Sequence, residues 1–312
     1  MITSMKRLLD WRVLIGLLVV LVALPLVVRN SEWHALNAAA RSGTTGAHVQ
    51  LSEGLVHYEV AGPETAPPVL LVHGFSVPSY IFDPTFAALV AAGHRVIRFD
   101  LYGRGTSDRP RGDYDIARFT RQIDELLTAL DVQGPVDLVG LSMGGPIVAA
   151  YTVAHPERVR RLVLLDPMAS TRDPGMLQWP LVGEYLFRVA VLPGMAAGQS
   201  SDFAHPERFP EWADRYREQM RYLGFGRAIL STLRHVITRD PMPTYQAVGA
   251  QRRPVLLIWG EQDQTTPYAL NTKVRQALGE HQFLSVPDAG HLPHLEHPEV
   301  VEPALLAFLA WP

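Results

Sequence analysis

The first residues that could do chemistry are the run GLSMGG at residues 140–145. It follows an apolar stretch, VDLV, and precedes a helix-like stretch, PIVAAY. In this context G-x-S-x-G is typical of a sharp strand-to-helix turn that exposes the serine hydroxyl, with glycines where backbones pass closely. The next backbone N–H, that of Met143, would lie at a helix N-terminus, where an oxyanion is stabilised. We therefore predict Ser142 as a nucleophile and Met143 as an oxyanion donor; the alternative is an ordinary glycine-rich turn.

A second oxyanion donor is predicted from His73-Gly74-Phe75, directly after the apolar run VLLV. In sites of this kind, the loop after that strand supplies a backbone N–H to the oxyanion. Phe75 is therefore our second donor, and its ring is equally compatible with plain pocket packing. His73 precedes the nucleophile in the chain, so we expect it to hold the loop by hydrogen bonds.

An acid is predicted at the end of the run VLLIWG, in the segment GEQD. A carboxylate at a strand end can accept a hydrogen bond from histidine Nδ1–H, fix the tautomer and stabilise the imidazolium. Asp263 fits that role. Glu261 in the same segment and Asp166, after the run RLVLL, are its rivals.

The general base is predicted in the segment DAGH, shortly after the run FLSV. His291 follows a glycine there, as expected of a loop histidine that reaches into a cleft. His294 and His297 crowd the same segment, so spacing alone does not choose among the three. We expect His294 and His297 to be capping or surface residues.

The elements that must position these residues alternate between strands and helices. The first two runs, 49–51 and 55–60, resemble a hairpin, and six short, mostly apolar runs predict strands covered on both faces: 69–72, 96–99, 136–141, 162–165, 255–259 and 283–286. Helical patterns fall at 82–92, 116–130, 146–154, 268–278 and 300–310. The alternation predicts an α/β fold with a mostly parallel, doubly wound sheet of about eight strands.

One interval, 167–253, shows helical patterns and no confident strand, which predicts a helical cap inserted over the sheet. Its apolar side chains could line a substrate pocket, and we single out Trp179, Tyr185 and Phe187. The alternative is that these side chains only dock the cap on the core. The expected organisation is an N-terminal segment (1–30), a connector (31–46), a core (47–166 and 254–312) and this cap.

Residues 13–28 are an uncharged apolar run, preceded by Lys6, Arg7 and Arg12 and followed by Arg29. Length and charge asymmetry favour a retained transmembrane anchor with a cytoplasmic N-terminus and the catalytic domain outside the cytoplasm. A cleaved signal peptide, leaving a secreted protein, is the second interpretation, because residues 38–40 are alanines. A buried N-terminal helix is the third.

Composition, net charge and cysteine content limit the fold classes, partners and chemistry that we expect for this chain. The 312 residues include 47% hydrophobic and 19% charged residues, which fits a globular protein with a sizeable core. A formal net charge of -3 gives no reason to expect a nucleic-acid partner. The chain has no cysteine, which excludes disulfides, thiol catalysis and cysteine-ligated zinc.

Taken together, HGF, Asp100 with GRGTSDRP, GLSMGG, GEQD and AGH resemble the α/β-hydrolase superfamily, especially its monoacylglycerol lipase-like and carboxylesterase-like members. The chain order Ser142, Asp263, His291 is the one associated with that fold. The resemblance implies Ser142 as nucleophile, Asp263 as acid, His291 as base, and Phe75 and Met143 as oxyanion donors. Serine at position 142 argues against haloalkane dehalogenase-like and epoxide hydrolase-like relatives, which use aspartate there.

The implied function is hydrolysis of carboxylic esters, with no metal or organic cofactor. Lipophilic esters such as monoacylglycerols, or short-to-medium acyl esters, are the expected substrates because they concentrate at a bilayer. A carbon–carbon bond hydrolase, a lactonase or a perhydrolase could use the same triad. A binding protein that keeps the fold without turnover is a further alternative.

Overall fold

The computed structural model of the chain describes residues 11–310. Within this range eight strands form one sheet in the order β1-β2-β4-β3-β5-β6-β7-β8. The strands are β1 (Ala47–Leu51), β2 (Gly54–Ala61), β3 (Pro68–Val72), β4 (Arg95–Phe99), β5 (Val136–Leu141), β6 (Val159–Leu165), β7 (Val255–Gly260) and β8 (Gln282–Val286). β2 pairs antiparallel with both β1 and β4, and every other pair is parallel. The predicted mostly parallel sheet of eight strands is confirmed.

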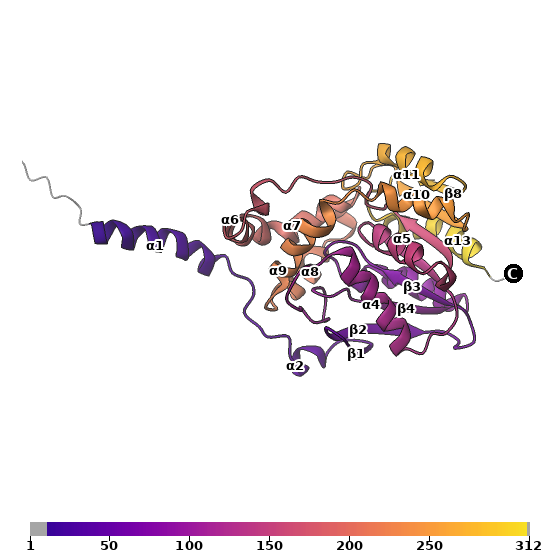
Figure 1. The fold of residues 1–312 in the computed structure, drawn as a ribbon, viewed down its shortest axis with the longest axis horizontal. Coiled ribbons are helices and arrows are strands. Elements are labelled where there is room, and N and C mark those ends of the chain that lie inside the picture. The colour runs from indigo at the N-terminus through magenta and orange to yellow at the C-terminus, as the bar shows by residue number, and fades with distance from the viewer. Residues whose placement is uncertain (1–10, 311–312) are drawn as a thin grey trace, which may run out of the picture.

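Helices cover both faces of this sheet (Figure 1). The α-helices are α1 (Trp11–Val28), α2 (Ala38–Arg41), α3 (Asp83–Ala91), α4 (Ile116–Ala129), α5 (Gly144–Ala154), α6 (Val182–Leu186), α7 (Met195–Gly198), α8 (Trp212–Met220), α9 (Phe225–Thr232), α10 (Met242–Ala250), α11 (Asn271–Leu278), α12 (Pro293–Glu296) and α13 (Pro298–Leu309). Short 3₁₀ or π helices are η1 (Ser79–Phe82), η2 (Pro156–Arg158), η3 (Gly175–Gln178), η4 (Phe187–Val191), η5 (Leu192–Gly194), η6 (Gln199–Asp202), η7 (Pro206–Arg208), η8 (Leu233–Ile237) and η9 (Tyr268–Leu270).

Two hydrophobic clusters lie on opposite faces of the central strands. Along β3, Leu70 and Val72 belong to one cluster, whereas Val69 and Leu71 belong to the other. This alternation follows from the two-residue side-chain period of a strand. A strand buried on both faces is apolar at most positions, which is why the predicted runs were nearly continuous. The first cluster includes residues of α4 and α5, and the second includes residues of α3 and α13.

The helical insertion after β6 has two parts. From η3 to η8 it forms the cap, whose described residues contain no strand and only an isolated bridge from Tyr222 to His34. The last helix of the interval, α10, instead lies against α5 and α11 in the helical layer on the sheet. The part of residues 167–253 that forms the cap therefore ends before α10.

The N-terminal helix α1 projects away from the rest of the molecule (Figure 1). It is an 18-residue helix with a mean hydropathy of 2.6 and no buried residue, long and apolar enough to cross a membrane. Lys6 and Arg7, which contribute to the predicted orientation, lie outside the described residues.

The packing of the sheet predicts that truncating an aliphatic side chain lowers the free energy of unfolding far more at a buried position than at an exposed one. We expect Leu138→Ala, at a fully buried position of β5, to lower the free energy of unfolding by about 2–5 kcal/mol, because truncation leaves a cavity in a packed core. Val153→Ala on α5, where the side chain is 37% exposed, should change it by less than about 0.5 kcal/mol. Urea unfolding followed by circular dichroism measures both, and equal losses would contradict the assignment of the core.

Candidate active site

Ser142 lies in a strained turn between β5 and α5. Its φ is +53°, a left-handed conformation that is uncommon for a residue other than glycine. Three hydrogen bonds of 2.9 Å hold the turn: Ser142 N–H donates to Leu165 O, and Ser142 O accepts from the N–H groups of Gly145 and Met168. The strand-to-helix turn predicted for GLSMGG is therefore present.

Glycines make this turn sterically feasible. A Cβ at Gly144 would lie 2.2 Å from Val72 O, and one at Gly140 would lie 2.6 Å from Gly144 O. A Cβ at Gly74 would lie 3.1 Å from Ser142 Cβ. The HGF loop thus passes directly beside the predicted nucleophile, and glycine at position 74 eases this close approach.

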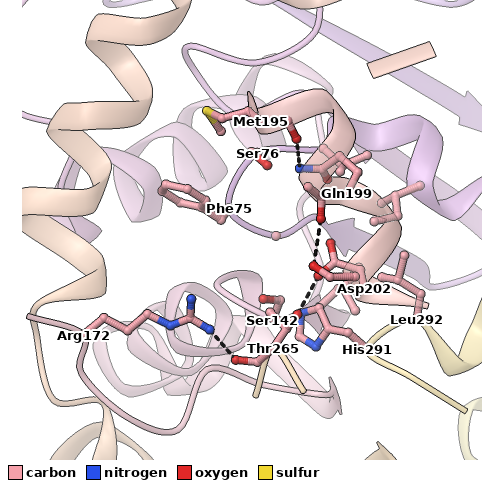
Figure 2. Close-up of a pocket in the computed structure, with 16 residues that line it drawn as sticks. Phe75, Ser76, Ser142, Arg172, Met195, Gln199, Asp202, Thr265, His291 and Leu292 are labelled. Atoms are coloured by element: carbon pink, nitrogen blue, oxygen red, sulfur yellow. Dashed lines mark hydrogen bonds between the residues drawn. The ribbon is translucent and has the colours of Figure 1, made fainter. Parts of the chain in front are cut away.

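Ser142 and His291 face one cavity of about 260 Å³ (Figure 2). Its walls come from the HGF loop, the turn after β5, the loops after β7 and β8, and the cap. The lining residues are Gly74, Phe75, Ser76, Val77, Ile81, Leu141, Ser142, Arg172, Met195, Gly198, Gln199, Ser201, Asp202, Thr265, His291 and Leu292.

Asp263 and His291 are joined by a 2.8 Å hydrogen bond between Oδ2 and Nδ1. Burial opposes ionisation of Asp263, but the nearby His291 charge and the hydrogen bonds from His291 and Thr266 outweigh it, so its pKa lies below the usual value. Burial likewise opposes protonation of His291, but the carboxylates of Asp263 and Asp202 raise its pKa above the usual value. The pair therefore stabilises an imidazolium, as a base that receives a proton requires.

The two rival acids take other positions. Glu261 is exposed and accepts a 2.7 Å hydrogen bond from the Ser285 hydroxyl. Asp166, at the end of β6, is fully buried, and its Oδ1 accepts from Gly260 N–H at 2.8 Å. Burial and the charge of Asp263 raise the pKa of Asp166 well above its usual value, so the surroundings of Asp166 oppose the charged form that would stabilise an imidazolium.

Among the residues that the structure describes, one group is spaced closely enough to hold a metal ion. It consists of Asp166, Asp263 and His291, whose potential ligand atoms lie within 4.8 Å of one another. Asp263 Oδ2 already accepts from the Thr266 hydroxyl at 2.6 Å as well as from His291. Two members of the cluster, Asp263 and His291, are therefore already hydrogen-bonded to each other.

The hydroxyl of Ser142 makes no hydrogen bond to any residue in the range 11–310. Its Oγ lies toward the HGF loop, 3.6 Å from where a Gly74 Cβ would be. The structure thus brings Ser142 and His291 to the same cavity, but no hydrogen bond joins the Ser142 hydroxyl to the His291 ring. Catalytic hydrogen bonds are often long before substrate binds.

Neither Phe75 N–H nor Met143 N–H donates to a protein acceptor within residues 11–310. Both donors therefore remain available beside Ser142. The Phe75 carbonyl is fixed by the buried Arg104, whose Nε and Nη2 donate to it at 2.9 and 2.7 Å. Arg104 also donates to Thr232 of the cap at 2.9 Å, which makes it a positioning residue that the sequence patterns did not single out.

The other candidate histidines have structural roles. His73 is buried, its Nε2 accepts from Leu101 N–H and its Nδ1 donates to Gly74 O, each at 2.9 Å, so it holds the loop as predicted. His297 is partly buried and bonds to Glu299 and to Asp288 O, each at 3.0 Å. The alternative of a surface position was wrong for His294: it is fully buried, and its Nε2 donates to Ile81 O, in η1, at 3.0 Å.

The three cap side chains singled out from the sequence do not line the cavity. Trp179 is 56% exposed, and Tyr185 is partly buried on α6. Phe187 is buried in the second hydrophobic cluster and packs toward α9, near Gly226. Helical periodicity identifies an apolar side chain but does not tell which side of a small cap it occupies.

The cap contributes mostly polar groups to the cavity (Figure 2). The Asp202 carboxyl, which accepts from the Thr265 hydroxyl at 2.6 Å, lies on its wall, and its backbone carbonyl accepts from His291 N–H at 2.7 Å. Gln199 belongs to the same wall, and Arg172, in the segment between β6 and the cap, also lines the cavity. No motif in the sequence marks these residues, because they reach the site only through tertiary packing.

Known proteins with the same architecture were found by sequence and by structure. A non-heme chloroperoxidase from Streptomyces lividans is 28% identical over 287 residues, covering 84% of this chain and 98% of that protein. An enol-lactonase from Burkholderia xenovorans LB400 superposes with a TM-score of 0.74 at 23% identity, covering 84% of this chain and 99% of the other. A thermophilic esterase from Thermogutta terrifontis gives a TM-score of 0.73 at 24% identity, covering 85% and 98%.

A family model described as the alpha/beta hydrolase fold matches residues 67–298, from the strand before the HGF loop to the start of α13. That range contains every residue of the predicted triad and both predicted oxyanion donors. Because the match covers well over half of the chain, this protein belongs to the α/β-hydrolase family.

Proposed function

We propose that this α/β-hydrolase cleaves carboxylic esters through an acyl-enzyme on Ser142. The observation that carries the proposal is the buried Asp263–His291 hydrogen bond on the wall of the cavity that Ser142 faces. Two N–H groups without protein acceptors, those of Phe75 and Met143, flank the same serine. Nucleophile, base, acid and oxyanion donors thus come from one sheet edge.

In the first half-reaction His291 accepts the Ser142 proton through Nε2 as Oγ attacks the ester carbonyl carbon. The carbonyl oxygen becomes an oxyanion, which Phe75 N–H and Met143 N–H stabilise by hydrogen bonds. His291 then gives the proton to the departing alkoxide, and the alcohol leaves an acyl group on Ser142. Asp263 holds the imidazole in the required tautomer and stabilises its cation.

In the second half-reaction water takes the place of the alcohol. His291 removes a proton from water, the resulting hydroxide attacks the acyl carbon, and the same two N–H groups hold the second oxyanion. Collapse of that intermediate releases the carboxylic acid as His291 returns the proton to Ser142. Every proton in this cycle passes through His291.

The cavity favours short-to-medium acyl esters over long-chain monoacylglycerols. Its volume of about 260 Å³ lies below the range of about 300–1,000 Å³ that is typical of pockets for drug-sized ligands. Asp202, Gln199 and Arg172 give this side of the cavity a polar character. A cavity of this size leaves little room for a long acyl chain.

The N-terminal helix supports a retained membrane anchor, and the basic residues before the apolar run favour a catalytic domain outside the cytoplasm. α1 has the length and composition of a span. Signal cleavage at the alanines of residues 38–40 would remove Glu32, whose carboxylate is buried and accepts from two backbone N–H groups of the cap. Loss of that charge would leave both donors without their partner, so the contact favours retention over the secreted alternative.

A second candidate function is hydrolysis of a lactone or a carbon–carbon bond in a substrate that carries a carboxylate. The observation that favours it is the Arg172 guanidinium on the cavity wall, which uses Nη2 to donate to Thr265 O at 2.6 Å (Figure 2). Arginine pairs readily with carboxylates. The solved enol-lactonase shares this architecture.

Ser142→Ala should abolish turnover and leave the fold intact, because only the attacking oxygen is removed. Esterase activity on p-nitrophenyl butyrate and labelling by a fluorophosphonate probe measure the effect, with circular dichroism as the check on folding. Wild-type protein that is neither active nor labelled would favour a binding protein without turnover. A variant that keeps more than a trace of activity would exclude Ser142 as the nucleophile.

The raised pKa of His291 fixes the direction of the pH dependence. The base must be neutral, so kcat/KM should fall as pH drops through a midpoint above the ordinary histidine value of 6.5. Asp263→Asn should lower that midpoint and reduce kcat/KM by roughly 10⁴-fold, as loss of the acid does in a serine triad. Asp166→Asn, which replaces the carboxyl by a neutral group of the same shape, is the matched control. We expect it to retain most activity and the wild-type midpoint; the reverse pattern would make Asp166 the acid.

A substrate panel tests the size and polarity of the cavity. We expect p-nitrophenyl acetate and butyrate to be cleaved with higher kcat/KM than the palmitate, because the cavity is short and partly polar. Enol-lactones and dienones that carry a carboxylate belong in the same panel. If they exceed the simple esters, and Arg172→Leu abolishes that advantage, the second candidate function replaces the first.

A further inference from the structure

Residues 30–35, which join α1 to the rest of the chain, are fastened to the cap; we call them the strap. Glu32 is 7% exposed, and its carboxylate accepts from Gly224 N–H at 2.8 Å and from Gly226 N–H at 2.5 Å. These donors lie at the start of α9, where a negative charge is favoured by the helix dipole and by unsatisfied N–H groups. A Cβ at Gly226 would lie 2.9 Å from the carboxylate, so glycine permits the close approach.

Backbone contacts fix the strap on both sides of this carboxylate. Trp33 N–H and His34 N–H each donate to Arg221 O at 3.0 Å, and Leu223 N–H donates to His34 O at 2.9 Å. At the end of α1, Arg29 Nη1 donates to Val189 O of η4 at 3.1 Å. The exit of α1 is therefore held in a defined place on the cap, beside η4.

Apolar side chains are exposed on the elements next to that exit. We call η3, α6, η4 and the residues between them the cap edge. Its exposed side chains are Met176 (54%), Trp179 (56%), Leu181 (83%), Val182 (43%) and Val191 (37%). Figure 1 shows α6 at the margin of the domain, near the end of α1.

Leu181 is the most exposed of these side chains, and its backbone is strained. Its φ of +64° is uncommon for a residue other than glycine. Arg234 holds the preceding turn by donating to Leu177 O at 2.6 Å. A strained backbone that persists in a folded protein often marks a functional position. Here that position carries a large apolar side chain that points outward, so we infer a function for Leu181.

We propose that the cap edge is a bilayer-docking surface, with its apolar side chains at the boundary between lipid headgroups and acyl chains. The proposal rests on the membrane anchor of the proposed function. If α1 crosses a bilayer, the membrane surface begins where α1 ends, and the strap holds that point against η4. Tryptophan and leucine are side chains that interfacial segments bury to a depth of about 5–10 Å.

The same arrangement places the catalytic cavity close to the lipid. Ala196 of α7 lines a hollow together with Val28 and Arg29 at the end of α1. Its neighbours Met195 and Gly198 line the catalytic cavity. One short helix thus separates the exit of the anchor from the site, so an ester concentrated in the bilayer has a short path to Ser142.

The absence of cysteine allows a direct test on the full-length chain. Leu181→Cys and Trp179→Cys are labelled separately with the fluorophore NBD and reconstituted in phosphatidylcholine vesicles. Val300→Cys is the matched control, because Val300 is a 37% exposed valine on α13, at the opposite end of the domain from α1 (Figure 1). Flotation of the vesicles and activity on a soluble ester are measured for every labelled protein.

We expect NBD at positions 181 and 179 to show a blue-shifted emission that lipids carrying a doxyl group quench, whereas NBD at position 300 shows neither. Emission at 181 and 179 that matches the control, in protein that floats with the vesicles, would overturn the docking surface but leave the anchor and the ester hydrolase standing. A blue shift without quenching by lipid would assign the cap edge to contact between protein copies and would also overturn the proposal. Protein that fails to float would remove the anchor and the docking surface together.

Discussion

The proposed site depends on one hydrogen bond, that between Asp263 and His291. The geometry of the sheet places these two residues close enough to form it. β7 and β8 are parallel neighbours, with Gly260 paired to Val286. Their following loops therefore leave the same edge of the sheet side by side, and Gln262 N–H donates to Ala289 O at 2.8 Å. A Cβ at Gly260 would lie 2.0 Å from Gly290 O, so the approach of the two loops requires glycine there. Backbone register therefore brings the proposed acid, Asp263, and the proposed base, His291, together before either side chain is considered.

The cap is part of this site as well as a cover over it. Glu296, fully buried, accepts from Gly290 N–H at 2.7 Å and from His205 N–H of the cap at 3.0 Å. Asp202 O accepts from His291 N–H, as described above. The loop that carries His291 is thus fixed from the sheet side and from the cap side. A displacement of η6 or η7 would move His291, so the packing of the cap would affect the geometry of the proposed triad.

The sequence predicted most of the features that depend on a few neighbouring residues, namely the strands and the turn that carries Ser142. The apolar runs identified all eight strands, and the turn glycines identified Ser142, because period and backbone freedom are encoded within a few residues. The hydrogen-bonded partner of His291 was also predicted, although Glu261 and Asp166 were rivals. What separates these acids is burial and distance, which no pattern of neighbouring residues records. Arg104 and Thr266 were missed for the same reason: each supports the site through a contact made by tertiary packing.

The cap was predicted least well, because the sequence does not tell whether an apolar side chain of a thin helical layer faces the cavity or the outer surface. Trp179, Tyr185 and Phe187 were expected to contact substrate because apolar cap residues often line a pocket. In the structure the cap wall of the cavity is mostly polar, and exposed apolar side chains such as Trp179 lie on the outer edge. On the proposed docking, apolar surface therefore serves to locate the enzyme at a bilayer, whereas polar groups select the substrate within the cavity. This division explains how an anchored hydrolase could act on short, partly polar esters: affinity for lipid belongs to the cap edge and α1, so the catalytic cavity needs no long apolar channel of its own.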